Sequence, residues 1–280
     1  MQPTLLFPWI HSYGLMLAVG FYAGWWLAAH RARQQGEGPD AHNGRDLVGD
    51  LVLLSILSGV GGARILWFAL HAKPTEPWWI LFKVWEGGLV FYGGLIGAGI
   101  ADAFYLWRRN VNLWKMADIL APAIAIGQAF GRLGCFLNGC CYGGPATDNF
   151  PLALRFPASL SPTGIPEGSP PFLDHLHHRW VTDTATTSLP IHATQLYASL
   201  SLFTITALVV AATPYKRRHG DLVAMVLILN ALSRMGIELV RRDTSPVALG
   251  LNAGHIGAIV VFLVGAAIFA RVRLKAPTTT

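Results

Sequence analysis

The sequence predicts an all-α integral membrane protein, a bundle of seven transmembrane helices with an outward-facing head region. The 280 residues are 53% hydrophobic and only 13% charged, with a mean hydropathy of +0.44. A soluble domain of this length carries about twice that charged fraction. Apolar stretches about 20 residues long recur along the chain, each long enough to cross a bilayer. We therefore expect residues 1–280 to form a single transmembrane domain.

Seven stretches meet this criterion, near residues 11–30, 47–70, 88–107, 117–137, 193–213, 221–241 and 253–271. We expect no signal peptide before them, because the first stretch is too long for one and is followed by positive charge instead of a cleavage site. Glycine pairs inside the stretches, such as Gly61-Gly62 and Gly93-Gly94, predict closely packed helices.

The basic residues predict the orientation of these spans. Twelve of the 21 Lys and Arg residues follow the odd-numbered stretches, on one side of a seven-span bundle: Arg31, Arg33, Arg45, Arg108, Arg109, Lys115, Lys216, Arg217, Arg218, Arg271, Arg273 and Lys275. Six lie on the other side, over far more loop: Lys73, Lys83, Arg155, Arg179, Arg241 and Arg242. Because cytoplasmic loops are enriched in Lys and Arg, the amino terminus is predicted outside and the carboxy terminus in the cytoplasm. The net charge of +6 reflects these anchors, and we expect no nucleic-acid binding.

On this topology, residues 138–192 form an outer cap inserted between spans four and five. The segment is rich in Pro, Gly, Ser and Thr, yet it contains Phe150, Phe156 and Trp180, which make it too apolar for a disordered linker. It also holds three histidines, His175, His177 and His178, which we expect to be solvated rather than bound to a metal.

Three arginines, Arg64, Arg132 and Arg234, fall inside the apolar stretches. A guanidinium stays protonated and is costly in hydrocarbon unless it meets an anion or water, so a phosphate is the natural partner. Arg241 lies near the outer end of the sixth stretch. Glu238 follows Arg234 by four residues on one helical face, which predicts an ion pair between them. Together these arginines predict a cationic site at the depth of an outer-leaflet phospholipid headgroup.

The chain has three cysteines, Cys135, Cys140 and Cys141. Their spacing matches neither a zinc-ligand pattern nor Cys-X-X-Cys, so we expect no metal ion. Small inert side chains are the expected role, and a disulfide in an oxidising compartment is the alternative.

Several motifs in this chain resemble those of the prolipoprotein diacylglyceryl transferase family. Residues 131–143 read GRLGCFLNGCCYG, which is similar to the family signature G-R-x-G-N-F-x-N-G-E-x-x-G. Further colinear matches are HSYGLM at 11–16, VWEGG at 84–88, FYGGLIG at 91–97, NFP at 149–151, HATQLY at 192–197 and the sixth stretch, which ends in arginine.

The resemblance implies a fold, a reaction and partners. The family's fold is a seven-span helical bundle with an outward head region, in the bacterial cytoplasmic (inner) membrane. Its reaction moves the diacylglyceryl group of phosphatidylglycerol to the thiol of the lipobox cysteine in a preprolipoprotein and releases glycerol 1-phosphate, the first step of lipoprotein maturation. The implied partners are phosphatidylglycerol, preprolipoprotein signal peptides with a lipobox cysteine, and membrane lipids. No cofactor is implied.

The same resemblance assigns candidate residues. Arg132, Arg241 and Tyr92 form the catalytic set, with the two arginines handling the phosphate. The candidate substrate-binding residues, from the motifs and from the charge argument, are Tyr13, Arg64, Asn138, Gly143, Gln195, Tyr197, Arg234 and Glu238.

Three positions depart from the family pattern. Tyr92 stands where the family has a histidine proposed as the general base, and a phenol with a pKa near 10 is a poor base at neutral pH. Cys135 and Cys140 replace an asparagine and a glutamate of the signature. Two alternatives therefore stay open: a related phospholipid-dependent transferase with another acceptor, and a non-catalytic lipid-binding membrane protein.

Overall fold

The structure is a computed structural model, which describes residues 12–38, 46–71, 77–84, 87–160, 166–241, 246–248 and 251–274. The motif residues His11, Trp85 and Glu86 lie outside the described residues, as do four of the basic residues used for orientation: Arg45, Lys73, Arg242 and Lys275. The chain forms two compact units, Met1–Gly24 with Leu120–Thr280, and Trp25–Ile119. Each unit is considered separately.

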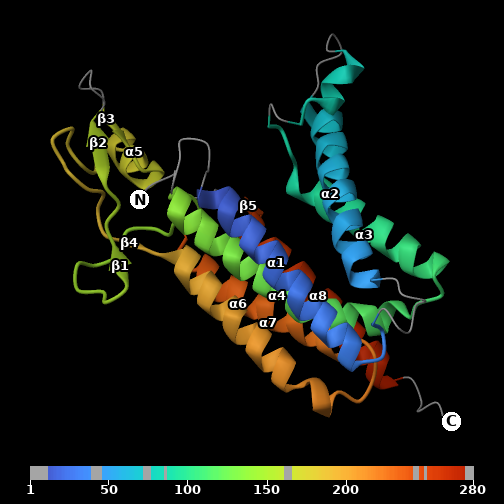
Figure 1. Ribbon diagram of the computed structural model, residues 1–280. Helices are drawn as coiled ribbons and strands as arrows, with labels where there is room; N and C mark the ends of the chain where they lie inside the picture. Colours follow the sequence, from blue (N-terminus) through green and yellow to red (C-terminus); the bar gives the residue numbers. More distant parts are fainter. Residues whose placement is uncertain are drawn as a thin grey trace. The chain divides into compact units, whose positions relative to one another are not determined.

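Every predicted span contains one long helix within the described residues (Figure 1). These helices are α1 (Ser12–Gln34), α2 (Leu47–His71), α3 (Phe91–Arg108), α4 (Leu113–Asn138), α6 (Thr194–Ala211), α7 (Asp221–Glu238) and α8 (Ala253–Leu274). Four of them, α2, α4, α6 and α8, are long and apolar enough to cross a membrane. The protein is therefore predominantly helical and of the membrane class, as its composition predicts.

The first unit is held together by small and branched apolar side chains between α4, α6 and α7. Its buried core consists of Ala121, Ala125, Ala129, Leu202, Ile205, Val209, Leu222 and Val226. Two hydroxyls add interhelical hydrogen bonds: Ser199 donates to the carbonyl of Ala129 at 3.0 Å, and Ser233 donates to Ser201 at 2.8 Å. Such bonds suit a bundle in lipid, where water does not compete for them.

Glycine sets the spacing of α1 against α4 in this unit. A Cβ on Gly20 would lie 3.0 Å from the carbonyl oxygen of Gly127, and one on Gly24 would lie 3.0 Å from that of Ala123. Two glycines four residues apart thus form one strip of close backbone contact, as is common between transmembrane helices.

Close backbone contact at glycines also joins α2 to α3 in the second unit. A Cβ on Gly93 would lie 2.3 Å from the carbonyl oxygen of Gly62, and one on Gly97 would lie 2.6 Å from that of Ser58. The glycine pairs therefore serve helix packing, as predicted. The segment between these helices holds a short 3-10 helix, η2 (Trp78–Phe82).

Within residues 138–192, the described residues 138–160 and 166–192 lie beyond the end of α4 and the start of α6 (Figure 1). The segment contains two antiparallel strand pairs and one helix. Strand β1 (Ala153–Leu154) pairs with β4 (Ile191–His192), and β2 (Ala158–Leu160) pairs with β3 (Pro166–Gly168). Helix α5 (Pro170–His177) follows β3. Phe156 and Phe172 are each 1% exposed and form its small core. Of the apolar residues that argued against a linker, Phe156 is thus a packing residue, whereas Trp180 is 47% exposed.

One histidine of this segment is not solvated, so that prediction was wrong for His175. Its side chain is 1% exposed, and its Nδ1 accepts a hydrogen bond from the Leu189 N–H at 3.2 Å. Burial lowers the pKa of His175, because desolvation penalises the charged ring. His177 and His178 are exposed, as expected.

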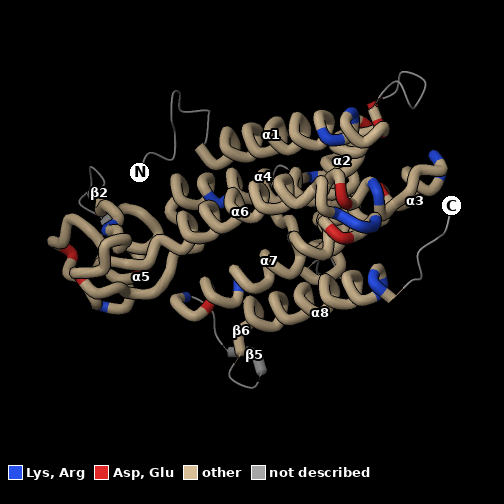
Figure 2. The backbone as a smooth tube through the Cα atoms, turned by 90° about the horizontal axis from the view of Figure 1, so that it is seen from below, with Lys and Arg blue, Asp and Glu red and all other residues tan. Residues whose placement is uncertain are grey.

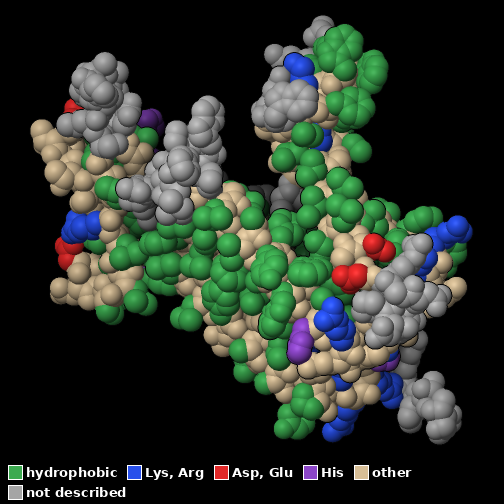
Figure 3. All heavy atoms as spheres, viewed as in Figure 1, with side chains coloured by type: hydrophobic (Ala, Val, Ile, Leu, Met, Phe, Trp, Pro, Cys, Tyr) green, Lys and Arg blue, Asp and Glu red, His purple; other side chains and the backbone are tan. Residues whose placement is uncertain are grey.

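Charged and apolar side chains separate along the helices of the first unit. α6 has no charged residue, and the basic residues of α8 stand in its last turn (Figure 2). Apolar side chains cover much of the face shown in Figure 3. The exposed apolar residues of the first unit include Leu200, which is 70% exposed, and Leu263, which is 60% exposed. Helices that expose this much apolar surface are suited to hydrocarbon contact.

Two further short strands, β5 (Pro246–Ala248) and β6 (Leu251–Asn252), pair before α8, and the 3-10 turn η4 (Thr213–Tyr215) follows α6.

Candidate active site

The site begins where α4 ends. Gly139 adopts a left-handed φ of 74°, the N–H of Cys140 donates to the carbonyl of Cys135 at 3.0 Å, and the N–H of Gly139 donates to that of Phe136 at 3.1 Å. This pair of hydrogen bonds around a left-handed glycine is the Schellman termination of a helix. It folds the chain back so that the residue after the glycine contacts the last turn. Cys140 is therefore brought onto Cys135.

The turn that follows is fixed by the start of α6 and the end of α7. Cys141 has a left-handed φ of 61°, and its carbonyl accepts from the Thr194 hydroxyl at 2.8 Å. The carbonyl of Cys140 accepts from the Gln195 side-chain amide, also at 2.8 Å. Further along, the N–H of Gly144 donates to the carbonyl of Val240 at 2.9 Å. Residues 139–144 are thus held by three helices at one end of the bundle.

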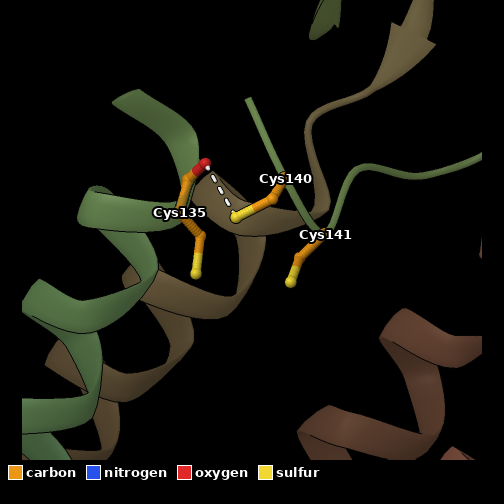
Figure 4. Close-up of side chains that lie close together, drawn as sticks. All are labelled: Cys135, Cys140 and Cys141. Atoms are coloured by element: carbon orange, nitrogen blue, oxygen red, sulfur yellow. Dashed lines mark hydrogen bonds between the residues drawn. The ribbon is translucent and has the colours of Figure 1, made fainter. Parts of the chain in front are cut away.

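The three cysteine side chains converge at this turn (Figure 4). Their sulfur atoms lie within 4.8 Å of one another, all three are partly buried, and all three are free thiols. The expected inert role of the three cysteines stays a prediction. The linear spacing did not reveal the cluster because the Schellman turn and the left-handed Cys141 change the direction of the chain twice within a few residues.

The cluster affects the ionisation of Cys140, which lies beyond the end of α4. Hydrogen bonds from the thiols of Cys135 and Cys141, followed by one from the Asn138 side chain, lower the pKa of the Cys140 thiol. Each donor stabilises the thiolate more than the thiol, and burial opposes the effect only in part.

The arginines predicted to handle phosphate gather at the same end of the bundle. Arg234 is close enough to Arg241, Arg132 and Cys141 for their charges to interact, and it pairs with Glu238 at 2.9 Å. The predicted ion pair is thus confirmed. Within the part of the chain that the structure describes, Arg132 has no carboxylate partner, so its charge is open to a ligand.

Glu238 itself is almost completely buried, at 1% exposed, against the first turn of α8. A Cβ on Gly254 would lie 2.4 Å from its carboxyl carbon and 2.5 Å from each carboxylate oxygen. The start of α8, which is capped by Asn252 through a 2.9 Å bond from the His255 N–H, carries the positive end of the helix dipole. Glu238 is therefore held between this helix start and Arg234, as a support of the cationic site.

The remaining predicted residues of the first unit line or brace this end. Tyr13, 38% exposed, packs on Gly134 and lies within electrostatic range of Arg132 and the three thiols. The N–H of Gly143 donates to the His192 carbonyl at 2.9 Å, and a Cβ there would lie 2.8 Å from that oxygen. The hydroxyl of Tyr197 lies 3.4 Å from the Leu152 carbonyl and 3.4 Å from Nδ1 of His192. These contacts join the cap to α6.

Arg64 belongs to the second unit and is surrounded by backbone carbonyls. It is 2% exposed, donates to Ile80 at 2.6 Å, Gly87 at 2.5 Å, Gly88 at 3.2 Å and Leu81 at 3.3 Å, and lies 4.5 Å from the Trp67 ring centroid. These contacts account for its buried charge without a phosphate. Its role in substrate binding stays a prediction.

Tyr92 also belongs to the second unit, in the first turn of α3. Its side chain is 62% exposed. An exposed phenol at a helix start is accessible to a substrate, and its catalytic role stays a prediction.

Sequence reasoning missed two residues that shape the site. Thr194 holds the Cys141 carbonyl, and Gly254 makes room for Glu238. Thr194 precedes Gln195 in the HATQLY motif, so this motif could have identified Thr194 as a site residue. Gly254 gave no signal, because nothing in the sequence connects the start of α8 with the end of α7.

The fold and the site together define a helical membrane protein with a cluster of arginines at one end of its bundle. Residues 4–271 match the family described as prolipoprotein diacylglyceryl transferase. The chain belongs to this family.

Relatives with the same description cover most of the chain. It is 33% identical over 251 residues to the phosphatidylglycerol–prolipoprotein diacylglyceryl transferase of Pectobacterium atrosepticum. The matched region covers 88% of this chain and 81% of that relative. It is 32% identical over 265 residues to that of Erwinia tasmaniensis, covering 91% and 86%. It is 27% identical over 237 residues to the transferase 2 of Clostridium perfringens, covering 84% and 80%.

Proposed function

We propose that this protein transfers the diacylglyceryl group from phosphatidylglycerol to the lipobox cysteine thiol of a preprolipoprotein and releases glycerol 1-phosphate. The observation that supports this most is the gathering of Arg132, Arg234 and Arg241 around the α4 turn in a member of this family. A cluster of partly exposed guanidinium groups at the end of an apolar bundle binds a phosphodiester well, because charge-assisted hydrogen bonds are strong where little water competes.

In this proposal the arginines act on the leaving group. As the thiolate sulfur attacks the glyceryl carbon, the carbon–oxygen bond to phosphate breaks and a second negative charge develops on the departing glycerol phosphate. Arg132 and Arg241 stabilise that charge where it forms, which lowers the barrier. Glu238 keeps Arg234 in place at 2.9 Å and limits the net positive charge of the empty site.

An apolar groove beside the site suits an acyl chain. It has a volume of about 410 Å³, begins at Tyr197, and continues along α6 past Leu200 to Leu208, with Leu229 of α7 also lining it. At 1.5 Å per residue this path is about 16 Å long, close to the length of most of an acyl chain. A phospholipid whose phosphate meets the arginines can thus extend a chain along α6.

The proposal includes the membrane topology. Seven spans in the bacterial inner membrane, with the amino terminus and residues 138–192 outside, place the arginines at the outer leaflet. The positions of the basic residues agree: Arg218 donates to the Val272 carbonyl at 2.7 Å at the end of the bundle that is formed by the start of α7 and the end of α8. That end is opposite to the α4 turn and carries predicted cytoplasmic anchors of the first unit, Arg218 and those in the last turn of α8, Arg271 and Arg273.

Two measurements test the function. Expression of this chain in a strain depleted of its own transferase should restore growth, and mass spectrometry of a co-expressed lipobox peptide should find a diacylglyceryl thioether on its cysteine. A peptide with serine in place of that cysteine is the control. Growth without the adduct would favour another acceptor, and co-purified phospholipid without either would favour a lipid-binding protein.

A further inference from the structure

The three thiols at the α4 turn form a cluster that the proposed phosphate site does not use. Cys135, Cys140 and Cys141 are all the cysteines of the chain, and they meet within 4.8 Å at one point. Such convergence of every thiol in a sequence of 280 residues indicates a shared ligand. Thiolates are the preferred ligands of soft and borderline cations such as Zn²⁺.

The cluster is built on a fixed backbone. Its first member sits in the last turn of α4, and the other two stand on a turn whose carbonyls are held by Thr194 and Gln195 at 2.8 Å. The left-handed φ values of Gly139 and Cys141, 74° and 61°, turn the two later side chains toward the first (Figure 4). A site held in this way is already arranged before its ligand arrives.

The surrounding charge suits a metal with three thiolates. A divalent cation and three thiolates carry one net negative charge. Arg234 interacts electrostatically with Cys141, and Arg132 lies near the cluster through Tyr13, which interacts with all three thiols and with Arg132. Two guanidinium groups thus offset the charge that an occupied site would bring.

We propose that Cys135, Cys140 and Cys141 bind a Zn²⁺ ion and that its open fourth position takes the acceptor thiol. Zinc sites with three protein ligands leave such a position for a reacting group, and a thiol that coordinates the ion is deprotonated. This inference rests on the proposed transfer to a lipobox cysteine. It provides a means of activating the acceptor in a chain that has Tyr92 at the position of the histidine in the family pattern that its motifs resemble.

The step balances without an oxidant or reductant. The lipobox thiol coordinates the zinc ion and releases its proton to water. The bound thiolate forms a sulfur–carbon bond to the glyceryl carbon next to the phosphate, and the carbon–oxygen bond breaks. Its electron pair stays with the oxygen of glycerol 1-phosphate, beside Arg132. The thioether is a weaker ligand than a thiolate and leaves the ion.

Cobalt substitution tests the metal site directly. The purified full-length protein, titrated with Co²⁺, should bind one equivalent and develop a thiolate-to-cobalt charge-transfer absorption that Zn²⁺ removes. Each of Cys135→Ser, Cys140→Ser and Cys141→Ser should weaken cobalt binding at least tenfold. The exposed cap variant Thr182→Ala is the matched control and should bind as the wild type does. A disulfide between any two of these cysteines under thiol-trapping conditions, or unchanged binding in the serine variants, would overturn the proposal.

Addition of a lipobox peptide to the cobalt protein tests the role of the open position. The charge-transfer absorption should change with the cysteine peptide and stay unchanged with its serine counterpart. No change with the cysteine peptide would rule out the acceptor role. Removal of zinc should lower kcat/KM at least tenfold, and zinc should restore it.

These readouts separate the inference from the proposed function. Full transferase activity in Cys140→Ser would overturn the metal role and leave the proposed function standing. The cobalt-substituted protein could respond to the cysteine peptide by a change in its absorption while the zinc form makes no thioether. That result would overturn the proposed function and support the thiol-binding metal site.

Discussion

Arg132 and Arg234 illustrate how neighbouring residues decide the role of a charge inside an apolar helix. Both are arginines inside apolar helices, and the sequence distinguishes them only by the glutamate that follows Arg234 by four residues. Arg234 has Glu238 at 2.9 Å, whereas Arg132 has no carboxylate partner among the described residues. A cation inside the apolar span of a membrane protein is costly without an anion, so Arg132 is the residue whose charge a bound phosphate would satisfy. Arg64 represents a third case, in which carbonyl groups surround the guanidinium.

Replacing Arg132 with alanine should therefore reduce turnover strongly. Arg132→Ala removes a charge-assisted contact to a buried anion, worth about 2–5 kcal/mol, which corresponds to a loss of roughly 30- to 5,000-fold in kcat/KM. Thioether formation on a lipobox peptide is the measurement. Arg155→Ala is the control, since Arg155 forms an exposed pair with Asp148 in the cap. Near-normal turnover in Arg132→Ala would show that Arg132 does not bind the phosphate.

Tyr92 should contribute a hydrogen bond rather than act as the base. On that view Tyr92→Phe lowers kcat/KM by roughly 10- to 100-fold, in line with one transition-state hydrogen bond of about 1.5–3 kcal/mol, and Tyr92→His retains activity. The pH dependence of kcat/KM in wild type and Tyr92→Phe is the deciding experiment. If the substitution abolishes one ionisation of the profile, Tyr92 is itself the base.

At the scale of elements, glycine decides how closely two helices approach. Gly93 and Gly99 both lie on α3 and look equivalent in the sequence. A Cβ on Gly93 would collide with the backbone of α2, and a Cβ on Gly99 would meet nothing within 4 Å. The FYGGLIG motif thus contains a packing requirement beside any catalytic one.

The contrast between these glycines is testable with two alanine variants. Gly93→Ala should destabilise the protein by about 1–3 kcal/mol, because the backbone of α2 must move away. Gly99→Ala should be neutral or slightly stabilising, by up to about 1 kcal/mol, because alanine favours a helix. Thermal unfolding in detergent measures both. Equal midpoints for the two variants would contradict the α2–α3 contact described above.

The cap should lose stability in mild acid because of His175. The ring accepts a hydrogen bond from Leu189, and burial lowers its folded-state pKa, so a proton binds the unfolded cap more tightly. The stabilisation is therefore complete above the unfolded pKa of about 6.5 and decreases as pH falls below it. Asp174 partly opposes this shift and His178 adds to it.

Amide hydrogen exchange of peptides from residues 186–192 should report this loss. Exchange should accelerate between about pH 6.5 and pH 5, after correction for intrinsic rates. The exposed neighbour gives a matched control: His177→Gln should keep the acid-dependent acceleration, and His175→Gln should remove it. An acceleration that persists in His175→Gln would assign the effect to another group.

At the scale of the whole molecule, the orientation in the membrane follows from charge placement. If residues 138–192 lie outside, alkaline phosphatase attached after Ser169 should be active, because the enzyme matures only outside the cytoplasm. A fusion after Arg218, between α6 and α7, should be inactive. An inactive fusion at Ser169 in a stably produced chain would reverse the topology.

The sequence by itself determined the membrane class, the positions of the long helices, the Arg234–Glu238 pair and the family. Each of these depends on local composition, helical spacing or contiguous motifs, and such signals are readable along the chain. The family motifs also predicted that Gln195 and Gly143 belong to the site, and both lie at the end of the bundle where α4 ends.

Only the tertiary structure decided what depends on turns and on distant packing. The three thiols meet because a Schellman turn and a left-handed cysteine reverse the chain, and no spacing rule for metal sites describes that geometry. Arg64 is satisfied by carbonyls of a segment that follows it by about 20 residues, and Glu238 depends on a glycine of the next helix. His175 is buried because α5 packs against the small cap core. Contacts of this kind join residues that the linear sequence gives no reason to connect, and for that reason only the folded chain reveals them.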